Sequence, residues 1–520
     1  MTEQFTTKEP QRYEDITVKN AESLYMTDVH RPFDVYMSFA SIGDERTMYN
    51  KFNDDPEIVE AGKAANRLVR FVIGGNTSTA VNKETGEALY GPKEFSSDEK
   101  LADARANMRK FENSVEIDQA KVLILNPDRD YTTPLQVVNV DKDPARYQGA
   151  EAAKLDGMGD MIFTYDPNVV LGVRPADCPL VIVSAETPKG RIYIMTHFAW
   201  QGAATNQIKD MEHEFDILGV DLSTATVYVT PGGQAESFPF ENAPYDPDEK
   251  YPYAEGLFQD VAAHSDSGET KYNFKIDTPH FVYQQLLSIG FTEEQIFLDT
   301  TDTTSPSAGT SSHSRSSRLD DDNGRDYVLV KLNKVESPIG SNPNKPTPPE
   351  IEWQITPLEV EYIDFNGEKQ QGTIEVNRDV YDDVKEFFAS ALELGFPIEK
   401  VVRSSDSDYA WDDDKLMAAN TSSSFNYRLI KGTDTPSLHG LGLAFDVNTR
   451  LNPYVRYNDD GTESIDPQGA AYEPDELGVL TADHPLVLFM KVRGWEWGGD
   501  WTKESGRTDY QHFQKSLKAE

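Results

Sequence analysis

The sequence predicts an α+β protein built from two domains. Its 520 residues exceed what a single hydrophobic core usually holds. Short apolar runs typical of strands alternate with stretches of helical periodicity along most of the chain. A segment rich in proline and small polar residues, 337–349, separates these elements into two groups. With 38% hydrophobic residues the chain can fill a core in each group.

The first domain is expected at residues 26–334, after a polar and acidic arm at 1–25. Apolar runs rich in Val, Ile and Leu predict buried strands, and longer periodic stretches predict helices between them. The predicted strands are 121–125, 169–173, 180–183 and 192–195, and the predicted helices are 203–218 and 279–289. A Ser/Thr run followed by acidic residues, 300–322, predicts an exposed loop.

The second domain is expected at residues 351–520, after a proline-rich linker at 335–350. Alternation of apolar and polar residues predicts strands at 360–362 and 372–376. Helical periodicity over 379–394 ends at a Gly-Phe-Pro sequence, which cannot continue a helix.

The charge balance narrows the classes of function. The chain has 89 acidic and 49 basic residues, a formal charge of −40 that repels nucleic acids and anionic membranes. No apolar run reaches the roughly 18 residues of a spanning helix, so no membrane insertion is expected. The first ten residues show no basic start and no apolar core, so we expect no signal peptide, a protein made in the cytoplasm, and any export by another route. The oligomeric state stays open.

One pair of motifs indicates a metal site. Residues 437–446 read Ser-Leu-His-Gly-Leu-Gly-Leu-Ala-Phe-Asp, and residues 509–512 read Asp-Tyr-Gln-His. Two imidazoles, His439 and His512, with the carboxylate of Asp446 form a common ligand set for catalytic Zn²⁺. Asp509 is placed to act as a general base. Taken alone, His439 and Asp446 also fit an ordinary glycine-containing start of a strand with a capping aspartate.

The second domain resembles the zinc D-Ala-D-Ala carboxypeptidases and endolysin L-Ala-D-Glu peptidases over nearly its whole length. The matching pieces lie in order, at 364–367, 372–377, 396–398, 417–428, 437–448, 452–455, 497–501 and 509–513. The resemblance implies a small α+β zinc-peptidase fold with a central antiparallel sheet. It also implies hydrolysis of peptide bonds in peptidoglycan stem peptides, as a carboxypeptidase or an endopeptidase.

Carried over residue by residue, the resemblance makes His439, Asp446 and His512 the zinc ligands and Asp509 the general base. Arg428 is then the donor for a substrate carboxylate or the reaction's oxyanion, unless it forms a surface salt bridge. Zn²⁺ is the expected cofactor, and no other is expected.

The sequence also supports predictions for four further features of this domain. Trp495, Trp497 and Trp501 are interpreted as core residues rather than a sugar-stacking surface. Asp500 is a candidate partner of a ligand histidine, and His484 is expected at a surface or a helix start. The acidic run 412–414 predicts a solvated turn, because it lacks the spaced ligands of a calcium loop.

The first domain more weakly resembles the YfiH-like polyphenol-oxidase, or laccase-domain, family, an α/β sandwich. The matching pieces are 159–164, 172–180 and 196–202, with a later piece at 312–315 and 324–325. The family's His-Cys-His set would correspond to Val138, Cys178 and His197, and valine can neither bind a metal nor move a proton. Two hypotheses remain: an altered hydrolase that uses Cys178 and His197, or a degenerate domain kept for binding or structure.

The preferred hypothesis is a zinc metallopeptidase acting on peptidoglycan peptides or precursors, fused to a YfiH-like domain that is degenerate. One alternative is a structural protein that binds a cell wall or a partner. The other is a nucleoside or peptidoglycan-precursor hydrolase that works through Cys178 and His197. The sequence does not show which peptide bond of the substrate is cleaved.

Overall fold

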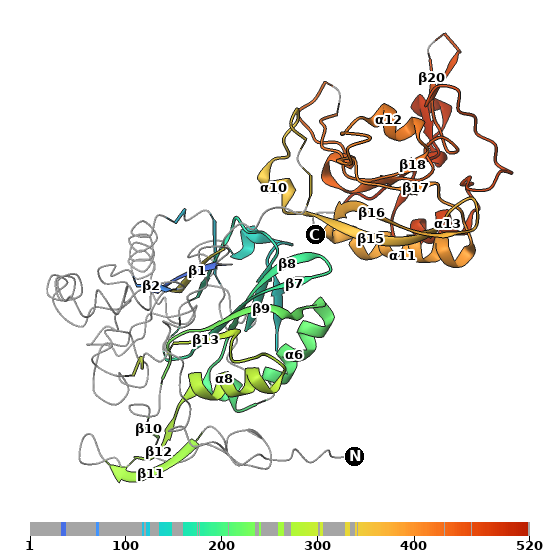
Figure 1. Cartoon of the computed structure of the whole chain (residues 1–520). Coiled ribbons are helices and arrows are strands. Elements are labelled where there is room, and N and C mark those ends of the chain that lie inside the picture. The colour runs from blue at the N-terminus through green and yellow to red at the C-terminus, as the bar shows by residue number, and fades with distance from the viewer. Residues whose placement is uncertain are drawn as a thin grey trace. The chain divides into compact units, whose positions relative to one another are not determined.

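The structure is a computed structural model of the whole chain, which divides into two compact units. Unit 1 comprises Met1–Glu186 and Arg191–Val335, and unit 2 comprises Thr187–Gly190 and Glu336–Glu520 (Figure 1). The structure describes residues 33–37, 69–71, 117–118, 121–124, 135–147, 160–173, 175, 177–205, 207–233, 239–240, 258–264, 272–299, 302–304, 328–332, 339–340, 342–430, 432–458 and 460–517.

Unit 1 contains two larger sheets and one small one. The first sheet has the order β2 (Val69–Phe71), β1 (Phe33–Met37), β14 (Val328–Leu332), β6 (Val170–Val173), β3 (Val122–Ile124). The second has the order β13 (Ile296–Leu298), β9 (Asp221–Val229), β7 (Leu180–Thr187), β8 (Gly190–His197), β5 (Met161–Thr164), β4 (Val137–Asn139). The small sheet joins β10 (Pro239–Phe240), β12 (Tyr272–Ile276) and β11 (Phe258–His264).

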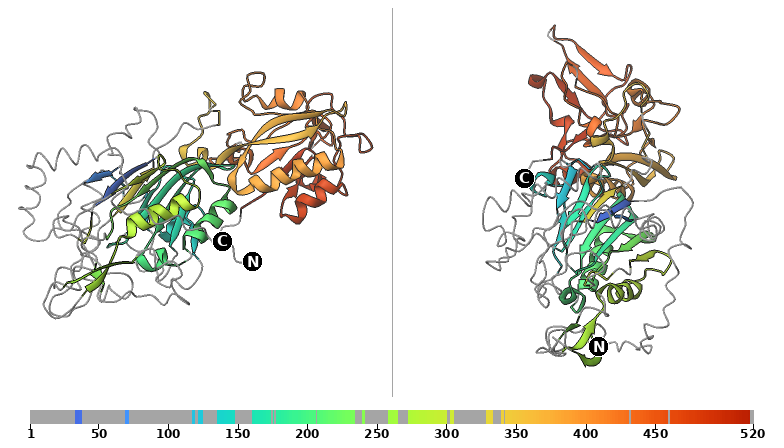
Figure 2. Two further views of the ribbon diagram at one scale, coloured as in Figure 1. Left: turned by 60° about the horizontal axis from the view of Figure 1, so that its bottom comes forward. Right: turned by 90° about the vertical axis from the view of Figure 1, so that its left-hand side faces the viewer.

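The core of unit 1 lies between the two larger sheets. Leu171 and Val330 from the first sheet and Ile182 and Met195 from the second belong to one buried cluster. Val181 and Val183, on the opposite face of β7, are also buried. Helices α6 (Gln207–Leu218) and α8 (Thr278–Ser288) lie along that face (Figure 2). Burial on both faces explains why these strands read as continuous apolar runs.

The regular elements expected in unit 1 are present where the structure describes it. The four predicted strands correspond to β3, β6, β7 and β8. The helix expected at 203–218 is two helices, α5 (Trp200–Ala203) and α6, and a 3₁₀ turn, η4, covers Pro144–Tyr147. The arm at 1–25, the motif pieces at 312–315 and 324–325 and most of 300–322 lie outside the described residues.

Unit 2 is built around one long hairpin and several short strands. The hairpin joins β15 (Ile355–Ile363) to β16 (Lys369–Asn377), and β17 (Lys400–Val401) pairs with β18 (Thr421–Ser422). Two further sheets are antiparallel: β19 (Ala444–Asp446), β24 (His512–Gln514), β22 (Glu496–Trp497), and β21 (Glu463–Asp466), β20 (Tyr454–Tyr457), β23 (Arg507–Asp509). The antiparallel pairing was expected, but it is spread over several small sheets rather than one central sheet.

The described residues of unit 2 form four α-helices and four 3₁₀ turns. They are α10 (Pro349–Glu352), α11 (Tyr381–Leu394), α12 (Asp413–Ala418) and α13 (Pro485–Val492), with 3₁₀ turns η6 (Arg378–Val380), η7 (His439–Leu441), η8 (Gly498–Asp500) and η9 (Lys503–Ser505). Helix α11 ends at Gly395, whose φ of 66° is the left-handed conformation that the predicted Gly-Phe-Pro stop requires.

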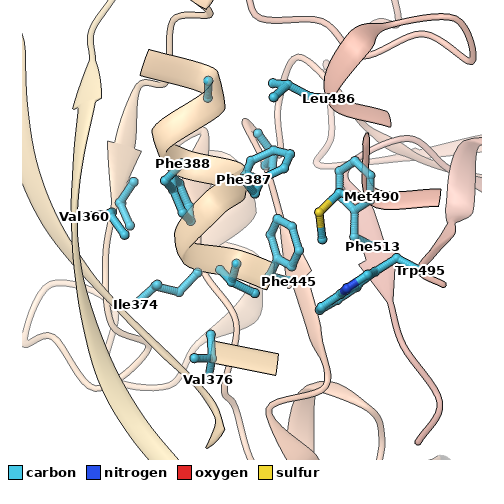
Figure 3. Close-up of a cluster of buried hydrophobic side chains, with 14 of the residues drawn as sticks. Val360, Ile374, Val376, Phe387, Phe388, Phe445, Leu486, Met490, Trp495 and Phe513 are labelled. Carbon is cyan, nitrogen blue, oxygen red and sulfur yellow. The ribbon is translucent and has the colours of Figure 1, made fainter. Parts of the chain in front are cut away.

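Aromatic side chains dominate the core of unit 2 (Figure 3). Phe445 of β19 and Phe513 of β24 are fully buried and stack with ring centroids 5.1 Å apart. Phe387 of α11 packs against both rings, at 5.0 and 5.5 Å. Each buried phenylalanine contributes roughly 1.5–3 kcal/mol of transfer free energy. This core therefore fixes the positions of β19 and β24 firmly.

Part of the segment expected as a linker belongs to the fold of unit 2. Ile339 is buried in a cluster with Ile351, Ile355 and Phe425. The short helix α10 begins within the same segment, at Pro349. Within the part of the chain that the structure describes, no helix combines the length and apolarity needed to cross a bilayer.

Candidate metal centre

The three predicted ligands come from two local structures. Asp446 ends β19 and His512 begins β24, and the strand register pairs these two residues directly. Phe445 and Phe513 are paired one position further along and point into the core. Because side chains alternate between the faces of a strand, Asp446 and His512 point away from that core together.

The third ligand, His439, is held by a tight turn, η7. Gly442 follows with φ 65°, and its N–H donates to the carbonyl oxygen of His439. A Cβ at Gly442 would lie 2.6 Å from Asn377 N and 2.7 Å from Ile355 Cδ1. Both the backbone conformation and the close approach require glycine here.

The ligand atoms converge on one point. His439 Nε2 lies 3.1 Å from His512 Nδ1 and 3.4 Å from Asp446 Oδ1, and His512 Nδ1 lies 3.0 Å from Asp446 Oδ1. Ligand atoms around a tetrahedral zinc ion, each about 2.0–2.1 Å from it, are roughly 3.3 Å apart. Among the residues that the structure describes, these three form the one cluster of three potential ligands.

Hydrogen bonds on the outer side of each ring fix which nitrogen faces the cluster. His439 Nδ1 lies 2.8 Å from the carbonyl oxygen of Ser424, which can only accept, so Nδ1 carries the proton. His512 Nε2 lies 3.1 Å from Gln514 Oε1. The amide of Gln514 is itself oriented, because its Nε2 donates to Glu496 Oε2 at 2.8 Å. Both inward nitrogens therefore present lone pairs, as metal ligation requires.

The electrostatics of the cluster favour a positive charge at its centre. Burial raises the pKa of Asp446, but the neighbouring charges and hydrogen bonds of His439 and His512 outweigh it and bring the pKa below its usual value. Burial lowers the pKa of His512, and Asp446 and Asp509 outweigh that effect and raise it. Two lone pairs and a carboxylate this close repel one another unless a cation or a proton lies between them. The donor set fits Zn²⁺.

Asp509 lies beside the cluster. Burial raises its pKa to about 6, and the charges of His512, Asp446 and His439 also act on it. Its Oδ1 is buried and has no hydrogen-bond partner among the described residues. The backbone of Gly498 crowds this residue, since a Cβ there would lie 2.5 Å from Asp509 O. A carboxyl with such a pKa can exchange a proton near neutral pH.

Arg428 is engaged with an acidic residue. Its Nη1 lies 2.9 Å from Asp413 Oδ2, and Asn426 Nδ2 donates to Asp413 Oδ1 at 2.6 Å. The expected solvated turn at 412–414 is therefore structured: Asp412 caps α12, and Asp413 orients Arg428. The role of Arg428 toward a substrate stays a prediction.

The other residues singled out in this unit fall into three groups. Trp495 and Trp497 are buried in the core, as expected, whereas the half-buried Trp501 lies against His512, with ring centroids 5.5 Å apart. His484 caps α13 by accepting from Leu486 N, which confirms the helix start. Asp500 pairs with Lys491 at 2.6 Å, and the side chain that supports a ligand histidine is instead Gln514.

Sequence reasoning missed Ser424, Gln514 and Glu496, which orient the two histidines. The role of Gln514 was only weakly indicated by the sequence, because a polar residue two positions after His512 in a strand lies on the same face as His512. Ser424 acts through its backbone carbonyl, so its side-chain type carried no information.

In unit 1 the structure brings two of the three family positions together. His197 ends β8, Cys178 precedes β7, and the charge of Cys178 and a hydrogen bond with it act on the His197 pKa. Val138 lies in β4, pairs with Ile162 and packs against the hydrophobic core. Valine at this position is therefore a core residue and adds no ligand to Cys178 and His197.

Family models match both halves of the chain. A D-alanyl-D-alanine carboxypeptidase model matches residues 431–515, which include the three ligands and Asp509. A multi-copper polyphenol oxidoreductase laccase model matches residues 93–333. The carboxy-terminal part thus resembles a peptidase, and the amino-terminal part resembles the YfiH-like laccase-domain proteins, as the sequence motifs indicated.

Solved structures similar to the chain are of the YfiH type. YlmD from Geobacillus stearothermophilus is 16% identical, with a TM-score of 0.36, and the match covers 50% of this chain and 86% of YlmD. The hypothetical protein YfiH of Bacillus licheniformis is 15% identical, with a TM-score of 0.35, over 45% of this chain and 82% of that protein. No curated protein matches the chain.

Proposed function

We propose that unit 2 is a zinc-dependent peptidase that hydrolyses peptide bonds of peptidoglycan stem peptides. The observation that carries this proposal is the convergence of His439 Nε2, Asp446 Oδ1 and His512 Nδ1 within 3.0–3.4 Å, with the other nitrogen of each ring within hydrogen-bonding distance of an outer oxygen. The peptidase family model over residues 431–515 supports the reaction class.

His439, Asp446 and His512 would hold the ion, which, when bound, supplies Lewis acidity toward the scissile carbonyl and toward a water molecule. Asp509 accepts the proton of the attacking water. A pKa near 6 leaves Asp509 largely ionised at neutral pH and still basic enough for this transfer. The protonated acid then donates to the departing amine, so one residue serves both steps.

Arg428 supplies a fixed positive charge for a substrate carboxylate or for the developing oxyanion. Asp413 holds its guanidinium in place before substrate arrives. If Arg428 binds the terminal carboxylate of the substrate, carboxypeptidase activity is favoured. If Arg428 instead contacts the oxyanion at an internal peptide bond, its role is compatible with an endopeptidase. The proposed partners are peptidoglycan peptides or precursors, and the proposed place of action is the bacterial cell wall.

The experiment combines metal analysis with muropeptide digestion. The purified chain is expected to contain about one zinc per molecule and to release new amines from cell-wall peptides, with the cleaved bond identified by mass spectrometry. His439→Ala and Asp509→Asn should each lower kcat by 10²-fold or more, and only His439→Ala should lose the metal. His484→Asn is the control, because asparagine keeps the cap of α13 outside the site.

Hydrolysis that persists in a folded His439→Ala protein would exclude this mechanism. A protein that binds zinc and cell-wall material but cleaves no peptide would instead support the alternative of a structural or binding protein. The remaining alternative, hydrolysis through unit 1, predicts turnover of nucleosides or precursors that His439→Ala leaves intact and His197→Gln abolishes.

A further inference from the structure

Unit 1 carries a second cluster of reactive side chains, at one edge of its second sheet. Asp160 directly precedes β5, His197 ends β8, and Cys178 lies two residues before β7. The backbone ties these three positions together. His197 N donates to Asp160 O at 2.8 Å, and Phe198 N donates to Pro179 O at 2.9 Å.

The imidazole of His197 lies between a carboxylate and a thiol. His197 and Asp160 are only 7% and 6% exposed, and His197 Nδ1 lies 3.6 Å from Asp160 Oδ1. Burial lowers the pKa of His197, but the charges of Cys178 and Asp160 outweigh it and raise the pKa to about 9. A carboxylate that holds an imidazole in one orientation beside a nucleophile is the arrangement of catalytic triads.

The backbone that presents Cys178 is strained. Asp177 has a φ of 68°, a conformation that non-glycine residues rarely adopt. It is held there by Thr303 Oγ1, which donates to Asp177 Oδ1 at 2.9 Å, and by Gly233 N, which donates to Asp177 O at 2.8 Å. Strain of this kind persists where surrounding contacts enforce it, and it is frequent at functional sites. Cys178 itself is half-buried.

We propose that Cys178, His197 and Asp160 form a metal-independent reactive-thiol site that takes small hydroperoxides. Cys178 passes its proton to His197, and Asp160 is the positioning residue. The sulfur attacks the distal oxygen, the S–O bond forms, and the O–O bond breaks. His197 gives its proton to the departing hydroxide, so the products are a cysteine sulfenic acid and water, or an alcohol from an organic hydroperoxide.

Two features select this class of substrate. A protonated imidazole assists most where the leaving group needs a proton, as hydroxide does. The half-buried position of Cys178 also favours a small substrate over a bulky one. Cys178 is the only cysteine of the chain, so its sulfenic acid cannot form an intrachain disulfide and must be reduced by an external thiol.

The single cysteine makes the test specific. The full chain, in EDTA at pH 6.5, is treated with hydrogen peroxide, and the loss of free thiol and the dimedone adduct of Cys178 are followed by mass spectrometry. The native protein should react at least tenfold faster than the same chain unfolded in urea. Iodoacetamide, which forms the S–C bond and releases iodide, should also react faster with the native protein, but by a smaller ratio, because iodide leaves without a proton. Neither comparison needs a variant.

Variants then assign the roles. His197→Gln should reduce the rate to that of the unfolded chain, and Asp160→Asn should reduce it severalfold and move the pH profile of alkylation to higher pH. Asp277→Asn is the matched control, since Asp277 is another buried aspartate beside a histidine, His280, at 2.9 Å. It should leave the rate unchanged.

Three results would overturn the proposal. One is a native thiol that reacts no faster than the unfolded one. Another is an equal loss of rate in Asp160→Asn and Asp277→Asn. The third is a thiol that reacts only after EDTA has removed a metal, because Cys178 would then be a ligand.

Discussion

At the scale of single residues, the orientation of the two histidines decides what the metal centre can do. Each ring has one nitrogen occupied on the outer side, by the carbonyl of Ser424 or by the amide of Gln514. The inner nitrogens face Asp446 and one another, so they can act as ligands once no proton lies between them. Partners of this kind typically change metal affinity by 10- to 100-fold although they never touch the ion.

Gln514→Ala should therefore weaken zinc binding by roughly 10- to 100-fold while leaving the fold intact. The affinity is measured by competition with a fluorescent zinc chelator. Gln371→Ala, an exposed glutamine on β16, is the control. Equal affinities for the two variants would show that Gln514 does not orient His512.

The buried carboxyl group of Glu375 affects the stability of the protein rather than the proposed reaction. Glu375 is 1% exposed, and Arg403 Nη1 lies 3.9 Å from its Oε1. Burial raises the pKa of Glu375 to about 7 from 4.5, although Arg403 acts in the opposite direction. The folded chain thus keeps a proton that the unfolded chain loses, so this stabilisation is full below pH 4.5 and is lost as the pH rises to about 7.

Glu375→Gln should remove this dependence and raise the free energy of unfolding above pH 7 by up to roughly 3 kcal/mol. Urea unfolding at several pH values between 4 and 8 measures it. Glu359→Gln, an exposed glutamate on the neighbouring strand β15, is the control. A destabilised Glu375→Gln protein above pH 7 would contradict the assignment.

At the scale of elements, two short strands and one turn build the centre. The pairing of β19 with β24 sends Phe445 and Phe513 into the core and Asp446 and His512 to the opposite side. A register shift of one residue would exchange the two pairs. The aromatic core therefore specifies the ligand geometry, and the turn at Gly442 brings His439 to meet it.

Gly442→Ala should lower the free energy of unfolding by more than about 2 kcal/mol and weaken zinc binding, because the new methyl group meets Asn377 and Ile355. Gly461→Ala is the matched control: its φ is 83°, and a Cβ there has nothing within 4 Å. That variant should cost only about 1 kcal/mol of conformational strain. Similar losses in urea unfolding of both variants would mean that the close approach at Gly442 is unimportant.

At the scale of the whole molecule, the chain is two compact units with separate cores. In the part of the chain that the structure describes, each unit carries one cluster of reactive side chains that bears on function, and the two clusters differ in kind. Unit 2 presents lone pairs around a point where a cation fits, whereas unit 1 presents a thiol beside an imidazole with a valine at the third family position.

Removal of zinc should consequently lower the melting temperature of unit 2 alone, by roughly 10 °C if the ion is bound about a thousandfold above its dissociation constant. Differential scanning calorimetry of the full chain with and without EDTA measures this, and added Zn²⁺ should reverse it where Mg²⁺ does not. The His439→Ala protein identifies the transition of unit 2, because EDTA should no longer move it. A shift of both transitions, or of neither, would contradict a single zinc ion bound in unit 2.

The sequence by itself determined the elements with strong local signals and the candidate ligands. The apolar runs of β6 to β8, the periodicity of α11 and its glycine stop depend on local physics, so they could be predicted. His439, Asp446 and His512 could be named because their residue types and order match a family. The chemistry of a ligand set is a property of its side chains.

Only the tertiary structure decided what surrounds these residues. The support of His439 by a backbone carbonyl, the pairing of Arg428 with Asp413 and the place of Asp160 beside His197 join segments far apart in the chain. Strand register and close packing set these contacts, and neither is encoded in spacing along the sequence. For the same reason Asp500 was a poor choice of partner and Gln514 was missed: proximity in the fold, rather than along the chain, determines which groups share a proton.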